Sequence, residues 1–203
     1  GRGTAVSVAA INGPENTVIS GPADELQRVL ASLAAEGVQS KPLHVSHAFH
    51  SALMDPVLDA FQDAVARVSL RAPAIPLISN LTGEVLSAED AVDPVRWRRH
   101  IREPVRFAPS LQRMHAMGVR TFLEIGPHPA LSAIGMSTIR DSDVHWLASM
   151  RRGRSAWLQV METTGALWEH GQAIDPAAFA DEHGGRVGDR KSTRLNSSHT
   201  QKS

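Results

Sequence analysis

The stretch Lys41-Pro-Leu-His-Val-Ser-His-Ala-Phe-His-Ser-Ala-Leu-Met54 joins a strand-like run to a segment with helical periodicity. Residues 39–46 predict a strand, and apolar residues at helical spacing predict a helix from His50 to about Val68. Side chains at strand-to-helix junctions project into clefts, and histidine exchanges a proton near neutral pH. This stretch therefore predicts an α/β fold with a candidate general base at position 50.

Two strands and a helix are predicted before this junction. Residues 6–11 and 16–20 are strand-like, and Asn12 begins the turn between them. Pro22 begins a helix with one apolar stripe, formed by Leu26, Val29, Leu30 and Leu33. Strand, strand, helix and strand are four of the six elements of a split βαβ sandwich. We therefore expect residues 1–46 to form a truncated ferredoxin-like subdomain.

Strands and helices alternate after the junction. Short strands are predicted at 74–79 and 120–125, the second one buried. Helices are predicted from Asp93 to about His100, from Glu103 to Gly118, and from Ala130 onward. This alternation indicates a parallel α/β layer. A last amphipathic helix is predicted from the stripe Trp157, Val160, Met161, Thr164 and Leu167.

Composition excludes several classes of protein. Lys+Arg and Asp+Glu balance at 21 each, so no net charge favours nucleic acid or a membrane surface. The absence of cysteine excludes disulfides and thiolate sites and suits a cytoplasmic location, and no apolar run is long enough to span a bilayer. Residues 189–203 are polar and resemble translated synthetic sequencing-adapter DNA, so we expect a non-native disordered tail, with a genuine disordered tail as the alternative.

The spacing of His44, His47 and His50 raises the question of a metal site. On a strand, residues three apart point to opposite faces, so His47 cannot join the other two around one ion. On a helix, residues six apart drift off the shared face. We therefore expect no bound metal here, and a general-base role that needs only His50.

The run Ser46-His-Ala-Phe-His-Ser-Ala-Leu-Met54 resembles the active-site histidine segment of malonyl-CoA:acyl-carrier-protein acyltransferases, and more narrowly the acyltransferase domain of modular polyketide synthases. Four further segments, at 8–21, 78–83, 102–107 and 123–129, resemble the family in the same order. The resemblance implies an α/β-hydrolase-like large subdomain, whose C-terminal part would be 47–145, with the ferredoxin-like subdomain inserted. Residues 146–188 resemble the linker that follows such domains.

The resemblance also implies a mechanism and partners. Malonyl would pass from malonyl-CoA to the phosphopantetheine of an acyl carrier protein through an acyl-serine, without a metal or redox cofactor. His50 would be the base, and the backbone carbonyl of His100 would orient its ring. His47, Ala48 and Phe49 match a tetrapeptide associated with malonyl selection. A neighbouring ketosynthase domain of the same polypeptide is a further expected partner.

One family feature is missing from the sequence. The nucleophile of the family lies in a Gly-His-Ser-x-Gly elbow, which this chain does not contain. We therefore expect the C-terminal portion of an acyltransferase domain, inactive alone. A free-standing fatty-acid-synthesis transacylase and a non-catalytic scaffold module are the alternatives. Asn12 is a possible cleft residue, although a turn role is favoured, and the basic residues 151–154 are expected to be solvated.

Overall fold

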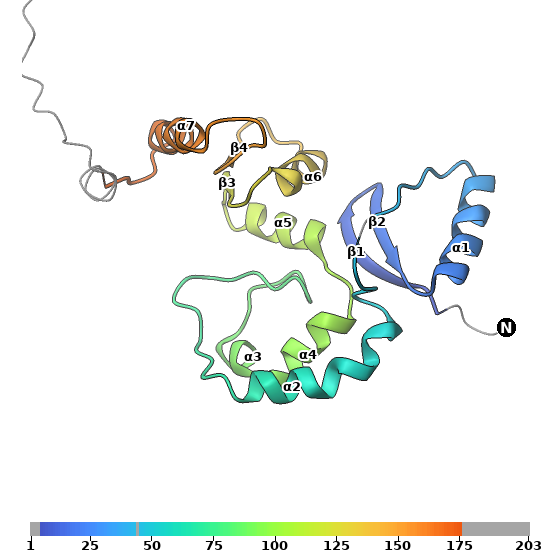
Figure 1. Cartoon of the computed structure of the whole chain (residues 1–203). Helices are drawn as coiled ribbons and strands as arrows, with labels where there is room; N and C mark the ends of the chain where they lie inside the picture. Colours follow the sequence, from blue (N-terminus) through green and yellow to red (C-terminus); the bar gives the residue numbers. More distant parts are fainter. Residues whose placement is uncertain (1–4, 44, 176–203) are drawn as a thin grey trace, which may run out of the picture.

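A β-hairpin and one helix form the N-terminal part of the computed structural model, which describes residues 5–43 and 45–175 (Figure 1). Strand β1 (Ser7–Gly13) pairs antiparallel with β2 (Asn16–Ser20), and helix α1 (Ala23–Ala35) follows with Pro22 at its N-cap. These elements confirm the predicted order of strand, strand and helix. The predicted apolar stripe of α1 is half-buried, which gives this helix one packed side.

The predicted strand at 39–46 is wrong for the residues that the structure describes. Residues 39–43 and 45–46 have irregular backbone, and His44 lies outside the described residues. Leu43 is 59% exposed and Val45 is 69% exposed. A strand requires a neighbouring edge for its backbone hydrogen bonds, and none of the described strands pairs with this segment.

The single helix predicted from His50 to about Val68 is divided into two. Residues Ala52–Val57 form the 3₁₀-helix η1, and Leu58–Ala66 form helix α2. Pro56 lies inside η1 and has no backbone N–H to donate, so a continuous α-helix is interrupted at this position. The strand predicted at 74–79 is reduced to an isolated antiparallel bridge between Ile78 and Val85.

Three helices follow, of which the second and third were predicted and the first was not; the third begins four residues later than predicted. They are α3 (Ala88–Val92), α4 (Pro94–Arg102) and α5 (Phe107–Ala116). The Ser87 hydroxyl accepts the Asp90 N–H at 3.0 Å, and the Asp93 carboxylate accepts the Val95 N–H at 2.9 Å. These side chains satisfy amide groups that a helix leaves free at its beginning.

The C-terminal part is built on a parallel pair of strands, as the alternation predicted. Strand β3 (Thr121–Glu124) pairs in parallel with β4 (His145–Ala148), and α6 (Ala130–Thr138) connects them. A small core lies where α5, α6 and the sheet meet, formed by Leu111, Ile139 and Val144 with Phe107, Met114, Phe122 and Trp146 packed around it. None of the helices within 5–43 and 45–175 has both the length and the apolar character that crossing a bilayer demands.

A strand forms within the predicted range 120–125, but its apolar side chains are not all buried as predicted. Leu123 is 38% exposed and Ile125 is 82% exposed, although parallel strands are normally covered on both faces. Burial depends on neighbours that a strand's own sequence does not specify.

Helix α7 (Ala156–Glu169) forms where predicted but packs on its polar side. Gln159 and Thr163 are buried, and both side chains donate to the Ala148 carbonyl, at 3.3 and 2.7 Å. Trp157 is 48% exposed and Met161 is 44% exposed. The periodicity therefore predicted the helix correctly and its packed face only in part: Val160, Thr164 and Leu167 are half-buried, whereas hydrogen bonding to β4 buries Gln159 and Thr163.

The hairpin is joined to the rest of the chain by backbone pairing. The Ile11 N–H donates to the Val105 carbonyl at 2.8 Å, and the Val105 N–H donates to the Ala9 carbonyl at 2.8 Å. The Thr138 hydroxyl donates to the Asn12 carbonyl at 3.3 Å. Strand β1 thus contacts segments about 100 residues away in the chain, and the proposed boundary at residue 46 is crossed by these contacts.

The carboxylate of Glu124 caps the helix that follows its own strand. Its two oxygens accept the backbone N–H of Leu131 at 3.0 Å and of Ser132 at 2.7 Å, and the Ser132 hydroxyl donates to it at 2.8 Å. Burial alone raises the pKa of Glu124, but these hydrogen bonds outweigh it, and the pKa lies below its usual range. Glu124 therefore stabilises the β3–α6 junction in its charged form.

We expect Glu124→Gln to lower the free energy of unfolding at pH 7 by about 1 kcal/mol, because the charge at the beginning of α6 is lost. A lowered native pKa stabilises above the ordinary glutamate pKa of about 4.3, and this contribution is lost as the pH falls below it. Urea unfolding at pH 7 and about pH 3 should show the difference between the two proteins shrinking in acid. The matched control is Glu15→Gln, an exposed glutamate in the β1–β2 turn; an equal loss in both variants would contradict the capping role.

Candidate active site around His50

His50 lies in a backbone turn that most residues avoid. Its φ is 61°, and it is the one non-glycine residue in the described part of the chain with positive φ. Its N–H donates to the Ile101 carbonyl at 3.0 Å, and its ring Nδ1 lies 2.8 Å from the Glu103 carbonyl oxygen. Two backbone carbonyls at the end of α4 therefore hold both the main chain and the ring of His50.

The contact with Glu103 fixes which ring nitrogen carries the proton. A carbonyl oxygen only accepts hydrogen bonds, so Nδ1 must be the protonated nitrogen in this contact. In the neutral ring, Nε2 then keeps its lone pair. Among the described residues, none forms a hydrogen bond with Nε2, and His50 is half-buried. This arrangement can accept a proton at Nε2, which is the chemistry of a general base.

The end of helix α4 places the Glu103 carbonyl. Glu103 is the C-cap of α4 in extended conformation, with φ −90° and ψ 159°, and Pro104 follows it. A proline disfavours helical backbone in the residue before it, so the helix must end here and the carbonyl turns away from the helix axis. Val105 then pairs with β1, which anchors the segment on its far side.

Ion pairs join α4 to the segment that follows His50. Arg102 Nε lies 2.8 Å from an Asp55 carboxylate oxygen, and Arg98 lies 2.9 Å from Asp59. Asp55 belongs to η1 and Asp59 to α2. Exposed pairs contribute little stability individually, but two of them across one interface restrict its register. Helix α4 and the η1–α2 segment therefore form one support under His50.

The orienting carbonyl expected at His100 is instead that of Glu103, three residues later. The physical reason is the helix end: the carbonyl of His100 lies within α4, whereas that of Glu103 follows its last residue. His100 is half-buried, and its Nε2 atom is shielded from solvent and unpartnered among the described residues. Burial, His50 and Arg96 together lower the pKa of His100, which keeps this ring neutral.

The three residues before His50 lie at the surface. His47 and Phe49 are exposed and Ala48 is half-buried, and Phe49 is 48% exposed. The Phe49 ring centroid lies 6.0 Å from that of His47 and 6.5 Å from that of His50. The structure thus brings the predicted selectivity residues beside the predicted base.

Asn12 lies in β1, close to the β1–β2 turn. Its side-chain amide donates to the Asn16 side chain at 3.3 Å. The turn predicted to begin at Asn12 is formed by Pro14 and Glu15, two residues later, and the place of Asn12 in a cleft stays a prediction. Among the described residues no three His, Asp or Glu side chains gather in a way that would hold a metal ion.

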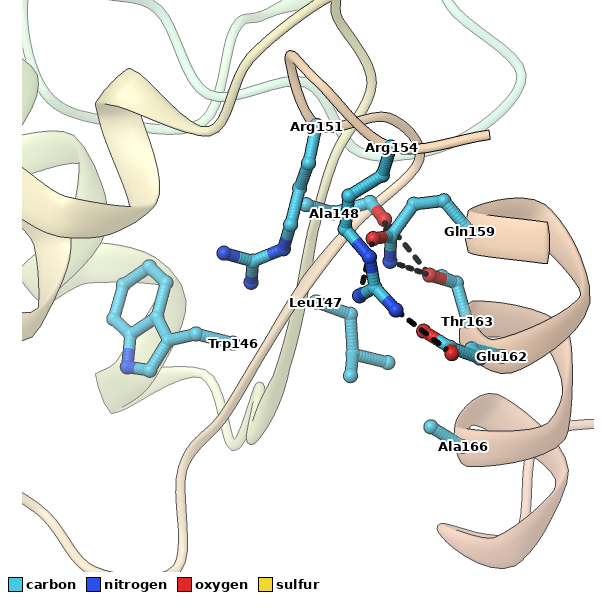
Figure 2. Close-up of a pocket in the computed structure, with 9 residues that line it drawn as sticks. All are labelled: Trp146, Leu147, Ala148, Arg151, Arg154, Gln159, Glu162, Thr163 and Ala166. Atoms are coloured by element: carbon cyan, nitrogen blue, oxygen red, sulfur yellow. Dashed lines mark hydrogen bonds and ion pairs between the residues drawn. The ribbon is translucent and has the colours of Figure 1, made fainter. Parts of the chain in front are cut away.

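A cavity of about 460 Å³ lies elsewhere, between β4 and α7 (Figure 2). Arg154 donates to Gln159 at 3.1 Å and pairs with Glu162 at 2.9 Å. The positive charge of Arg154 is therefore balanced by a carboxylate that also lines the cavity. A second cavity, of about 560 Å³, lies beside His145 and His170. Neither of these two cavities is lined by residues 45–54. We assign the site by its hydrogen-bond geometry, since proton transfer depends on it and not on cavity size.

Comparison with known proteins identifies the family. Residues 3–172 match the family described as the acyl transferase domain. The chain is 38% identical over 188 residues to polyketide synthase GfsA of Streptomyces halstedii, covering 91% of this chain and 2% of that protein. It is 42% identical over 149 residues to mycoketide-CoA synthase of Mycobacterium tuberculosis, covering 73% of this chain and 4% of that protein.

Solved structures agree with this assignment. The acyltransferase domain from the second module of the salinomycin polyketide synthase superposes with a TM-score of 0.81 at 37% identity, over 86% of this chain and 41% of that one. A Streptococcus pneumoniae MCAT superposes with a TM-score of 0.68 at 29% identity, over 77% of this chain and 50% of that one. The chain spans half or less of these proteins. Its family match, its mixed α/β fold and its similarity to these domains show that it belongs to the acyl transferase domain family of polyketide synthases.

Proposed function

We propose that this chain is the base-carrying part of an acyltransferase domain that transfers malonyl from malonyl-CoA to an acyl carrier protein through an acyl-serine. The observation that carries the proposal is the contact of His50 Nδ1 with the Glu103 carbonyl at 2.8 Å, which leaves Nε2 as proton acceptor. In each half-reaction Nε2 would take the proton of the attacking hydroxyl or thiol. It would return that proton to the departing thiol or to the serine.

The serine of the proposed reaction belongs to the part of the domain that this sequence does not span. The chain covers 41% of the salinomycin domain, and it contains no Gly-His-Ser-x-Gly elbow. The proposed division is a partial small subdomain at 1–46, the large subdomain at 47–145 and a following linker at 146–188. The expected tail at 189–203 lies outside the described residues. We expect the chain alone to form no acyl-enzyme.

The proposal is tested by completing the domain. The chain would be joined to the N-terminal part of the salinomycin second-module domain, to which it is 37% identical. Intact-protein mass spectrometry would follow acylation by malonyl-CoA and transfer to a phosphopantetheinylated carrier protein. We expect a malonyl adduct on the joined protein and none on the chain alone. A folded joined protein without an adduct would favour the non-catalytic scaffold.

The side chain of Phe49 is the proposed determinant of malonyl selection. We expect Phe49→Ser in the joined domain to raise methylmalonyl transfer relative to malonyl, since a smaller residue leaves space for the α-methyl group. One methyl group is worth about 1–3 kcal/mol, so the ratio should shift by about 10-fold or more. Competition between the two CoA esters measures it. Leu53→Ser, another exposed apolar residue, is the control; an unchanged ratio in Phe49→Ser would remove the steric explanation.

The proposed partners follow from the same assignment. The acyl acceptor would be the phosphopantetheine arm of a carrier protein, with no metal or redox cofactor bound by this chain. The matched relatives are far longer than this segment, which covers 2% of polyketide synthase GfsA. A ketosynthase domain of the same polypeptide is therefore a proposed neighbour, in a cytoplasmic assembly.

A further inference from the structure

Ser51 has an environment unlike that of any other serine described. Its side chain is completely buried, with 0% exposure, although it directly follows the half-buried His50. Its hydroxyl donates to the Ala48 carbonyl at 2.7 Å and accepts the Leu53 N–H at 3.3 Å. The same hydroxyl thus bonds to the chain on both sides of His50.

The backbone around Ser51 explains what those two hydrogen bonds hold. His50 has φ 61°, whereas Ser51 returns to extended backbone with φ −133° and ψ 171°. A non-glycine residue in the left-handed region is unfavourable by about 1–2 kcal/mol and persists only when its surroundings impose it. The Ser51 hydroxyl links Ala48 to Leu53 and so closes the turn around His50. This closed turn imposes the left-handed backbone on His50.

We propose that Ser51 is a positioning residue for His50: its buried hydroxyl holds the left-handed turn that brings the ring to the Glu103 carbonyl with the proton on Nδ1. The inference deepens the proposed function and rests on it for its catalytic meaning. The hydroxyl touches neither substrate nor reacting atoms. It acts by fixing the backbone from which the ring projects.

The test reads the tautomer of His50 in the full 203-residue chain. Long-range ¹H–¹⁵N correlation spectra, recorded where the ring is neutral, distinguish protonated Nδ1 from protonated Nε2. The signals of His50 are identified by their loss in His50→Asn. In the native chain we expect the Nδ1–H tautomer to predominate. In Ser51→Ala we expect the major tautomer to change to Nε2–H, because the turn relaxes and the ring leaves the carbonyl.

Two matched variants separate positioning from general stability. Ser51→Thr keeps the hydroxyl on the extended backbone that β-branched residues favour, so the Nδ1–H tautomer should be restored. Ser87→Ala removes a serine cap of the same kind at α3, away from His50, and should leave the tautomer unchanged. An unchanged tautomer in folded Ser51→Ala would overturn the proposal.

A second comparison applies if Ser51→Ala does not fold. Glycine adopts positive φ freely, so a chain with His50→Gly has no strained residue for the hydroxyl to hold. We then expect the double variant His50→Gly/Ser51→Ala to fold with a melting temperature close to that of His50→Gly. Failure of the double variant to fold would show that the hydroxyl serves the core and not His50. These readouts need no activity, so they fail independently of the proposed acyl transfer.

Discussion

His50→Ala should slow acylation of the completed domain by malonyl-CoA about 10²–10⁴-fold, the usual contribution of a general base. The loss is expected because no other described group occupies the position of Nε2, and His100 is half-buried with its pKa lowered. The effect should fall on the rate of adduct formation measured in a single turnover. Binding of malonyl-CoA should change far less, since the base acts in the transition state.

The left-handed backbone at position 50 requires a second variant. Alanine fits positive φ poorly, so part of its effect could come from a relaxed turn. Asparagine tolerates this region, and His50→Asn therefore removes the base while keeping the backbone. We expect the same rate loss in both variants with native circular dichroism. His128→Ala, an exposed histidine before α6, should acylate normally. Normal acylation of His50→Asn would exclude His50 as the base.

Gly135→Ala should be the most destabilising single-methyl change in the C-terminal part. A Cβ at Gly135 would lie well inside the van der Waals radius of the Trp146 ring. That ring is stacked on Phe122, with centroids 4.6 Å apart and planes 15° apart, and it packs against the core. It cannot move without displacing the strand pair. We expect a loss of about 2 kcal/mol or more, and a melting temperature lower by about 5 °C or more.

Gly165→Ala is the matched control, because Gly165 is also a helical glycine but has open space where a Cβ would lie. Alanine has the higher helix propensity, so this variant should be neutral or more stable by up to about 1 kcal/mol. Calorimetry or urea unfolding of both variants measures the difference. Equal melting temperatures for Gly135→Ala and Gly165→Ala would mean that α6 does not approach Trp146 this closely.

Some features of the fold were predictable because they depend on local chemistry. The β1–β2 turn just after Asn12, the proline beginning of α1 and the Asp93 cap of α4 each involve residues within a few positions of one another. Periodicity likewise predicted α5 and α7. The strand-to-helix junction predicted at His50 is correct only in its helical half, because η1 begins at Ala52 but the run before His50 does not pair as a strand.

The features that were predicted wrongly depend on distant neighbours. The orienting carbonyl is that of Glu103 because α4 ends before Pro104 and Val105 pairs with β1, a contact over about 95 residues. The burial of Ser51 gave no signal in the sequence beyond its place next to His50. Helix α7 presents its polar side to β4 because the Ala148 carbonyl requires hydrogen-bond donors.

The amino-acid sequence alone determined the family, the mixed α/β class and the identity of the candidate base, because motifs, caps and turns are encoded over a few neighbouring residues. Only the tertiary structure decided which carbonyl meets that base, which nitrogen carries the proton and which helix faces are buried. These depend on how separate segments satisfy one another's backbone groups, from 11 residues apart for Gln159 and Ala148 to 53 for His50 and Glu103, and such pairing is set by packing in three dimensions.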